Sequence, residues 1–161
     1  MSQQRIKIIA DTREQAPFEF SGYAADIERG TLPAGDYSVK GMERLAAVER
    51  KSIADLVGTL TTGRERFERE LAILKGYVLA AVVVEGSIDD IRQANYRSKA
   101  SPEAVMQSCY AFQVRYRVPF LFCCDRRNAE HATFGLLSKT LREVATRYER
   151  IVKAHGPLVA A

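Results

Sequence analysis

The spacing of hydrophobic and polar residues predicts several strands along the chain. Tyr77–Val84 is a continuous apolar run, which is typical of a strand that is covered on both faces. Tyr37–Val39 and Leu45–Lys51 flank a polar turn, and together they predict a β-hairpin. Further apolar strands are predicted over Ile6–Ala10 and Val118–Cys124.

Apolar residues at helical spacing predict helices between and after these strands. Ser52 is a candidate N-cap, and Asp55 stands where a capping box needs its acidic partner. The predicted helices cover Tyr23–Arg29, about 53–60, Glu65–Lys75, 88–91, Ser101–Tyr116 and a long amphipathic segment from Asn128 or Ala129 to about Lys153. Because strands and helices alternate in the second half, we expect an α/β fold with helices on both sides of a sheet.

Length and composition indicate one globular domain. A chain of 161 residues can bury a substantial core, and its 47% hydrophobic and 27% charged residues argue against disorder. We expect the domain to cover residues 1–155, followed by a frayed tail over residues 156–161. No apolar run approaches the ~20 residues that span a bilayer, and charges interrupt the N-terminal segment before a signal-peptide core develops. We therefore expect no membrane partner.

Cysteine usage and net charge add weaker constraints. Cys109, Cys123 and Cys124 make a poor disulfide framework, and we expect the adjacent pair to be small core residues in a strand. The two histidines do not add the spacing of a zinc site. A reducing, cytoplasmic location is therefore expected, with association to the nucleoid in a bacterium or archaeon. The net charge of +4 permits a polyanionic partner without requiring one.

The residues that could carry chemistry gather in the predicted hairpin. Glu49 and Lys51 stand two apart on one strand, so their side chains share a face, whereas Arg50 points the other way. A hairpin that closes near Gly41 brings Asp36 beside Glu49. Two carboxylates suit Mg²⁺ or Mn²⁺, and a neighbouring ammonium suits phosphodiester hydrolysis. By spacing alone, a solvated hairpin face is the more common explanation.

The surrounding motifs sharpen this hypothesis. In chain order they are Asp11-Thr12-Arg13-Glu14, Gly35-Asp36-Tyr37, Glu49-Arg50-Lys51 with Asp55 four residues beyond the lysine, and Thr62-Gly63-Arg64. This order closely resembles the XPF-type structure-specific endonuclease family, and the resemblance is sharp over Ile8 to Gly63. It implies a restriction-endonuclease-like fold, with a central mixed β-sheet flanked by helices on both sides. It also implies an endonuclease that cleaves DNA, often at flaps, forks or branched junctions.

The resemblance assigns a metal centre to the predicted hairpin. Asp36 and Glu49 would be ligands of Mg²⁺ or Mn²⁺, and Lys51 would be the catalytic lysine. Asp11 would be an auxiliary acidic residue near the metal.

Five further residues would complete the site by the same resemblance or by their charge. Arg13 and Arg50 would support the site or touch the scissile phosphate, and Asp55 would complete the acidic cluster while it also caps its helix. Arg64 and Arg66 are candidates for DNA-binding residues, because arginine binds phosphate without reading sequence. A solvated helix start explains this arginine pair equally well.

Alternatives remain open for catalysis and assembly. One alternative is a non-catalytic or partner-dependent DNA-binding nuclease-like module, although such modules typically lose the acidic and lysine residues that are intact here. A small-molecule enzyme is not supported, because no Gly-rich phosphate loop or Ser/His/Asp array is present. The resemblance also implies a homodimer, or pairing with a heteromeric DNA-processing partner, through the last helix. The stripe of Leu137, Leu141 and Val144 is alternatively explained as intramolecular core.

Overall fold

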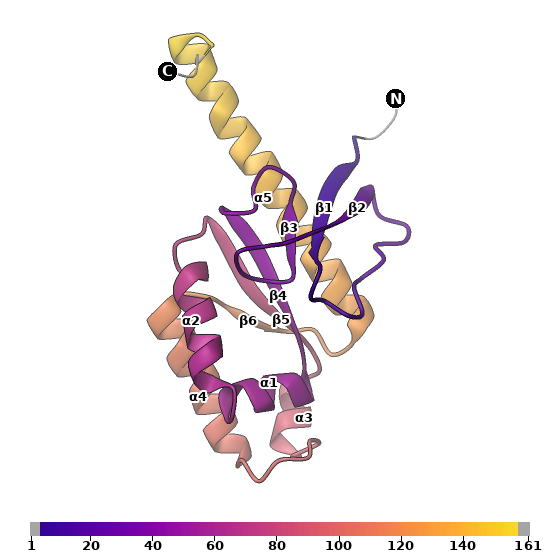
Figure 1. Cartoon of the computed structure of the whole chain (residues 1–161), viewed down its shortest axis with the longest axis vertical. Coiled ribbons are helices and arrows are strands. Elements are labelled where there is room, and N and C mark those ends of the chain that lie inside the picture. Colours follow the sequence, from indigo (N-terminus) through magenta and orange to yellow (C-terminus); the bar gives the residue numbers. More distant parts are fainter. Residues whose placement is uncertain (1–3, 158–161) are drawn as a thin grey trace.

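The computed structural model describes residues 4–157, and its centre is a six-stranded sheet (Figure 1). Its strands are β1 (Ile6–Asp11), β2 (Ala25–Gly30), β3 (Tyr37–Val39), β4 (Ala46–Ser52), β5 (Leu79–Glu85) and β6 (Phe120–Phe122). In space they follow the order β2-β1-β3-β4-β5-β6. Strand β3 runs antiparallel to its neighbours β1 and β4, whereas the other pairs are parallel. The sheet is therefore mixed, as expected.

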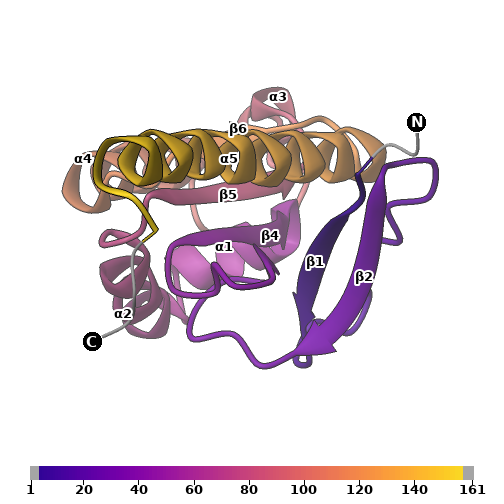
Figure 2. The ribbon, with the colours of Figure 1, turned by 90° about the horizontal axis from the view of Figure 1, so that it is seen from above.

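Helices cover both faces of this sheet (Figure 2). They are α1 (Ile53–Leu60), α2 (Arg64–Leu74), α3 (Ile88–Arg92), α4 (Pro102–Tyr116) and α5 (Arg126–His155). Helix α5 lies along one face, against β3, β4 and β5, while α1, α2 and α4 pack on the other. The predicted α/β fold, with a central mixed sheet between helix layers, is confirmed.

Strand β5 shows how the apolar pattern produces these layers. Val82 and Val84 belong to the core formed with α1, α2 and α4, whereas Val83 belongs to the core formed with α5. Successive side chains of a strand point to opposite faces, so a continuous apolar run buries both faces.

Within residues 4–157, no helix is both long enough and apolar enough to cross a membrane.

The edge of the sheet corrects one prediction. The segment Tyr23–Arg29 was expected to be helical, but Ala25–Gly30 forms β2 and pairs with the whole length of β1. The free edge of β1 presents backbone donors and acceptors, and pairing with them outweighs a weak local preference for helix. At the other end of the chain, residues 158–161 of the predicted tail lie outside the described residues.

The adjacent cysteines correct another prediction. Strand β6 ends at Phe122, before both of them. Cys123 is half-buried, and Cys124 is exposed with a φ of +68°. The expectation that the pair lies in a strand core is therefore wrong, because the chain already turns toward α5 at this point. The buried cysteine is Cys109, in α4.

The loop before β3 is held closely against β4. Gly35 has a φ of +80°, and a Cβ atom there would lie 2.9 Å from the Cβ of Ala47. The Asp36 amide donates a hydrogen bond to the Val48 carbonyl at 2.9 Å. Tyr37 pairs with Val48 across β3 and β4, which confirms the predicted hairpin. The pairing brings Asp36 to the level of Glu49.

We expect Gly35→Ala to destabilise the protein more than Gly41→Ala. Both glycines have a positive φ, but a Cβ atom at Gly41 would have no neighbour within 4 Å. The left-handed conformation costs an alanine about 1–2 kcal/mol at either position. At Gly35 the overlap with Ala47 adds about 1–3 kcal/mol to this loss. Urea unfolding measures both free energies, and equal losses would contradict the close packing of this loop.

Candidate active site

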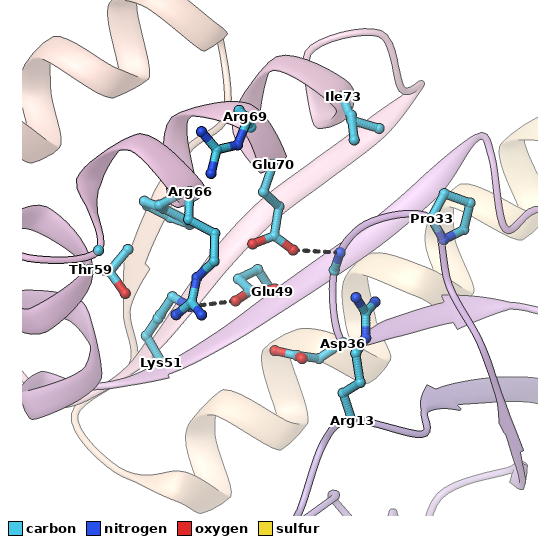
Figure 3. A pocket seen from close by; sticks show the side chains of 13 residues that line it. Arg13, Pro33, Asp36, Glu49, Lys51, Thr59, Arg66, Arg69, Glu70 and Ile73 are labelled. Carbon is cyan, nitrogen blue, oxygen red and sulfur yellow. Dashed lines mark hydrogen bonds and ion pairs between the residues drawn. The ribbon is translucent and has the colours of Figure 1, made fainter.

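The predicted metal ligands Asp36 and Glu49 and the predicted catalytic Lys51 line a cavity of about 410 Å³ beside the end of β4 (Figure 3). The cavity lies between the loop before β3, strand β4 and helices α1 and α2. It is lined by Arg13, Pro33, Gly35, Asp36, Glu49, Lys51, Thr59, Gly63, Arg66, Phe67, Arg69, Glu70 and Ile73. The structure therefore brings Asp36 together with Glu49 and Lys51. Glu49 and Lys51 are near neighbours in the sequence, whereas Asp36 precedes them by more than twelve residues.

Glu49 and Lys51 form an ion pair inside this cavity. They share one face of β4, and the Nζ atom of Lys51 lies 2.5 Å from Oε1 of Glu49. Burial raises the pKa of Glu49 well above its ordinary value, and the charge of Asp36 raises it further. Burial opposes the charge of Lys51, but the charge and hydrogen bond of Glu49 outweigh it and raise the pKa of Lys51. The ion pair therefore favours the charged form of Lys51.

Asp36 is the second carboxylate of the cavity, and it is half-buried. Its Oδ2 atom accepts a hydrogen bond of 2.8 Å from the amide of Arg50. Burial raises the pKa of Asp36 to about 6 despite this hydrogen bond, and the charges of Glu14 and Glu70 act in the same direction. Without a cation, the site thus disfavours full ionisation of its carboxylates.

These residues fit a hard divalent cation. Asp36 and Glu49 supply carboxylate oxygens, and Mg²⁺ commonly takes one or two carboxylates while it keeps water and phosphate ligands. Between residues 4 and 157, no group of three or more His, Cys, Asp or Glu side chains is arranged to enclose a metal ion. Two carboxylates leave the other ligand positions of such a cation to water and phosphate oxygens.

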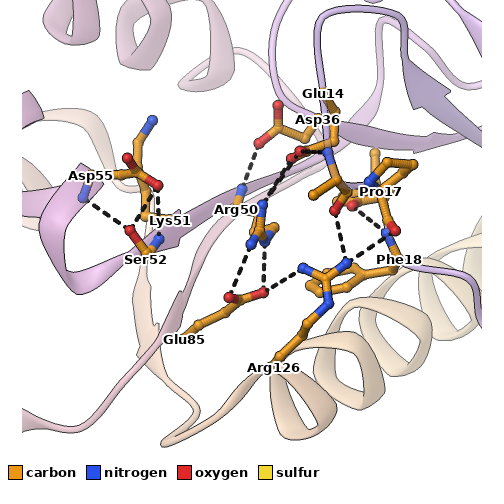
Figure 4. Close-up of polar contacts among 12 residues, drawn as sticks. Glu14, Pro17, Phe18, Asp36, Arg50, Lys51, Ser52, Asp55, Glu85 and Arg126 are labelled. Carbon is orange, nitrogen blue, oxygen red and sulfur yellow. Dashed lines mark hydrogen bonds and ion pairs between the residues drawn. The ribbon is translucent and has the colours of Figure 1, made fainter.

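Arg50 points away from the cavity, as the strand alternation predicts (Figure 4). Its Nε and Nη2 atoms lie 2.6 and 3.0 Å from the Glu85 carboxylate, and Nη1 lies 3.3 Å from Glu14. Arg126 binds the same Glu85 carboxylate at 3.1 Å and also donates to two carbonyl oxygens of the loop after Glu14. These contacts suit the supporting role predicted for Arg50, which also lines the groove that adjoins the cavity.

Asp11 and Arg13 form a second ion pair next to the cavity. The Nε and Nη2 atoms of Arg13 lie 2.7 and 3.0 Å from the Asp11 carboxylate, which also accepts the Leu32 amide. Burial raises the pKa of Asp11, but the hydrogen bonds from Arg13 and Leu32 outweigh it, and the net shift is downward. Arg13 lines the cavity, whereas the Asp11 side chain is turned toward Arg13. The Asp11 amide, however, donates to the Asp36 carbonyl at 2.8 Å.

Asp55 caps helix α1. Its Oδ2 atom accepts from the Ser52 side chain at 2.7 Å, and its amide donates to Ser52 Oγ at 3.0 Å. The predicted capping box is confirmed. Asp55 also lines a groove that continues from the cavity past Lys51 and Thr62. It therefore lies beside the acidic residues, at an exposed position.

The two arginines predicted to bind DNA lie in different surroundings. Arg66 is exposed and lines both the cavity and the adjoining groove. Arg64 packs against α4, where it donates to Ser108 Oγ at 3.1 Å and lies 4.6 Å from the centre of the Phe112 ring. The structure thus gives Arg66, rather than Arg64, direct access to a ligand in the cavity.

The sequence analysis missed two charged residues of the cavity. Arg69 and Glu70 stand three and four positions after Arg66 in α2, so they share its helix face. Glu70 also accepts a hydrogen bond from the Gly35 amide at 3.0 Å. The helical spacing from Arg66 could have indicated both residues, but not the contact with Gly35.

The mixed sheet, its two helix layers and the cavity with Asp36, Glu49 and Lys51 define a nuclease-type α/β domain. A family model described as the ERCC4 domain matches residues 10–133, so the chain belongs to the ERCC4 domain family. The resemblance to an XPF-type nuclease domain is thereby confirmed. No curated protein sequence matches the chain significantly.

Solved structures share the fold. XPF from Aeropyrum pernix superposes with a TM-score of 0.68 at 20% identity, over 83% of this chain and 61% of that chain. XPF from Aeropyrum pernix in complex with DNA superposes with a TM-score of 0.67 at 20% identity, over 86% of this chain and 66% of that chain. This chain thus spans less than two thirds of the length of either relative.

Glu85→Gln tests the network behind β4. Glu85 neutralises two guanidinium groups, of which Arg50 is 16% exposed. We expect the variant to lose about 3 kcal/mol of stability, because it leaves a largely buried cation with too little negative charge. Glu143→Gln is the control, since Glu143 pairs with Arg147 on an exposed face of α5 and its loss changes little. Equal thermal denaturation curves for the Glu85 variant and the wild type would contradict the proposed importance of this network.

Proposed function

We propose that this chain is a divalent-metal-dependent DNA endonuclease domain that hydrolyses phosphodiester bonds. The observation that carries the proposal is the convergence of Asp36, Glu49 and Lys51 on one cavity, with exposed arginines around it. Two carboxylates and a lysine at the end of a strand suit metal-assisted phosphodiester hydrolysis, because they can hold the cation and stabilise the charge that develops on the phosphate.

In this proposal, Asp36 and Glu49 would hold Mg²⁺ or Mn²⁺. The cation would supply Lewis acidity and lower the pKa of a bound water molecule. Asp11 would serve the same centre from its flank, since its main chain holds Asp36 and its carboxylate orients Arg13. Asp55 would add negative charge in the adjoining groove.

The basic residues would bind and stabilise the phosphate. Lys51 forms an ion pair with Glu49 inside the cavity, and in this proposal it would stabilise negative charge on the reacting phosphate. Arg13, Arg66 and Arg69 line the same cavity, and guanidinium groups suit the planar, bidentate recognition of phosphate oxygens. Arg50 would keep β4 and the loop after Asp11 in place from behind.

DNA is the proposed substrate. The related protein solved in complex with DNA is XPF from Aeropyrum pernix, and the ERCC4 domain family covers most of this chain. Flaps, forks and branched junctions are the DNA structures to test first. The alternative is a DNA-binding module that cuts only with a partner, which the same assay separates from an autonomous nuclease.

We expect the purified protein to cut labelled DNA with Mg²⁺ or Mn²⁺ and to lose this activity with a chelator. Asp36→Asn and Lys51→Met should each lower the cleavage rate by about 100-fold or more, because each removes a charge at the reacting phosphate. Glu103→Gln is the control, since Glu103 contacts Gln107 on the exposed surface of α4. Linear, flap, fork and single-stranded substrates should be compared.

The outcome separates the two functions. The proposed mechanism would be refuted if folded Asp36→Asn protein cut DNA as fast as the wild type. Wild-type protein that binds DNA but cuts none of the substrates would favour the partner-dependent module.

We further propose that the chain forms a homodimer through the second half of α5. The buried residues of this helix, from Ala129 to Ser138, lie in its first half, and the rest projects beyond the sheet in Figure 1. Tyr148 and Ile151 are 55% and 46% exposed. They continue the spacing of Leu141 and Val144 in steps of three and four residues, which is typical of a helix that packs on another helix.

Sedimentation equilibrium tests this assembly. We expect a wild-type dimer and a monomer for the double variant Tyr148→Ser and Ile151→Ser, because the variant removes the apolar surface of the projecting helix. Val114→Ser is the control, since Val114 is 82% exposed on α4. A monomeric wild type would refute the homodimer and leave a heteromeric partner to be sought.

A further inference from the structure

Glu70 connects helix α2 to the loop that carries Asp36. Its Oε1 atom accepts the hydrogen bond from the Gly35 amide at 3.0 Å. Figure 3 shows Glu70 on α2, with its carboxylate directed across the cavity toward this loop. Glu70 is thus the α2 residue that reaches the neighbour of Asp36 through a hydrogen bond.

The Gly35 amide depends on such an acceptor. Gly35 is buried, and its Cα lies so close to β4 that a Cβ atom would meet the Ala47 side chain at 2.9 Å. A buried amide without an acceptor is costly, and Glu70 provides one. The next amide, of Asp36, donates to the Val48 carbonyl at 2.9 Å. Two successive amides therefore fix Asp36 between α2 and β4.

The helix that carries Glu70 is packed into the core. Phe67, Leu71 and Leu74 of α2 are buried in the core with α1, α4 and the sheet. Phe67 also lies below Lys51, whose Nζ atom is 5.0 Å from the ring centre. Because one helix supports both Lys51 and the Gly35–Asp36 loop, it can set the distance between the two sides of the cavity.

We propose that Glu70 is a positioning residue of the nuclease site, which places Asp36 for cation binding through the hydrogen bond to Gly35. This inference rests on the proposed function, since it assigns Asp36 to that site. The acceptor atom is the property of Glu70 on which this inference rests, whereas its negative charge acts separately on the carboxylates of the cavity. A glutamine keeps the acceptor without the charge, and an alanine removes both.

The experiment compares Glu70→Gln, Glu70→Ala and the wild type by three measurements. These are hydrogen exchange of the Gly35 amide by NMR, calorimetric affinity for Mn²⁺ alone, and steady-state DNA cleavage. Glu68→Ala is the matched control, because Glu68 lies on the same helix but binds Arg115 and Tyr116 of α4. Glu70→Met, which has the length of glutamate without a strong acceptor, replaces the alanine variant if that protein does not fold.

We expect Glu70→Ala to accelerate Gly35 exchange by about 10-fold, as for the loss of one hydrogen bond. Its Mn²⁺ affinity should fall by about 10-fold, as when a residue that supports a metal ligand is lost. Its kcat should fall by about 10-fold with KM nearly unchanged, because the loop acts on the reaction rather than on DNA binding. Glu68→Ala should stay within about 2-fold of the wild type in all three. Glu70→Gln should keep Gly35 exchange within about 2-fold of the wild type and should lose less Mn²⁺ affinity than Glu70→Ala, because it keeps the acceptor.

Two results would overturn the inference. One is unchanged Gly35 exchange in Glu70→Ala. The other is a Glu70→Gln protein that loses as much Mn²⁺ affinity as Glu70→Ala, since the charge would then be what counts. The exchange measurement needs neither cation nor substrate. Suppose that the wild type cuts no DNA, while Gly35 exchange is faster in Glu70→Ala and unchanged in Glu70→Gln and Glu68→Ala. In that case the proposed function fails, but the hydrogen bond by which Glu70 holds this loop is supported.

Discussion

The main chain of Asp36 joins the two halves of the sheet, and the rest of the site depends on that connection. Its carbonyl accepts the Asp11 amide at the end of β1, and its amide donates to Val48 in β4. Strand β3, which follows it, has only three residues and runs against both neighbours. This short reversed strand carries Asp36 to the point where β1 and β4 approach each other. The carboxylate of Asp36 therefore lies in the same cavity as Glu49, and only the short strand β3 and a turn separate Asp36 from β4.

The side chains of strand β4 have different roles on its two faces. Glu49 and Lys51 face the cavity, while Arg50 between them binds Glu85 and Glu14 on the opposite side. The backbone amide of Arg50 nevertheless donates to the Asp36 carboxylate. One residue thus anchors the strand from behind and orients a carboxylate in front. The pleat of the strand makes this division possible, since alternate side chains cannot share a face.

The cavity places several carboxylates close together, and the basic residues around them do not offset the full effect on their pKa values. Burial raises the pKa of both Asp36 and Glu49, and Glu70 adds a further negative charge nearby. Lys51 offsets part of this charge through its ion pair with Glu49. A divalent cation would offset more, which is the physical reason to expect one at this position. Sites that accept such strain are typically functional, because packing alone would favour apolar residues.

The sequence by itself determined the features that repeat at short range. Alternation along β4 separated Arg50 from Glu49 and Lys51, and the Ser52–Asp55 pair predicted the cap of α1. The tertiary structure decided what depends on distant partners. Residues 25–30 became a strand because β1 offered an edge, Arg64 turned to α4, and Glu70 reached Gly35 across 35 positions. Periodicity reports which face a residue takes, but it carries no information about which distant backbone group that face will meet.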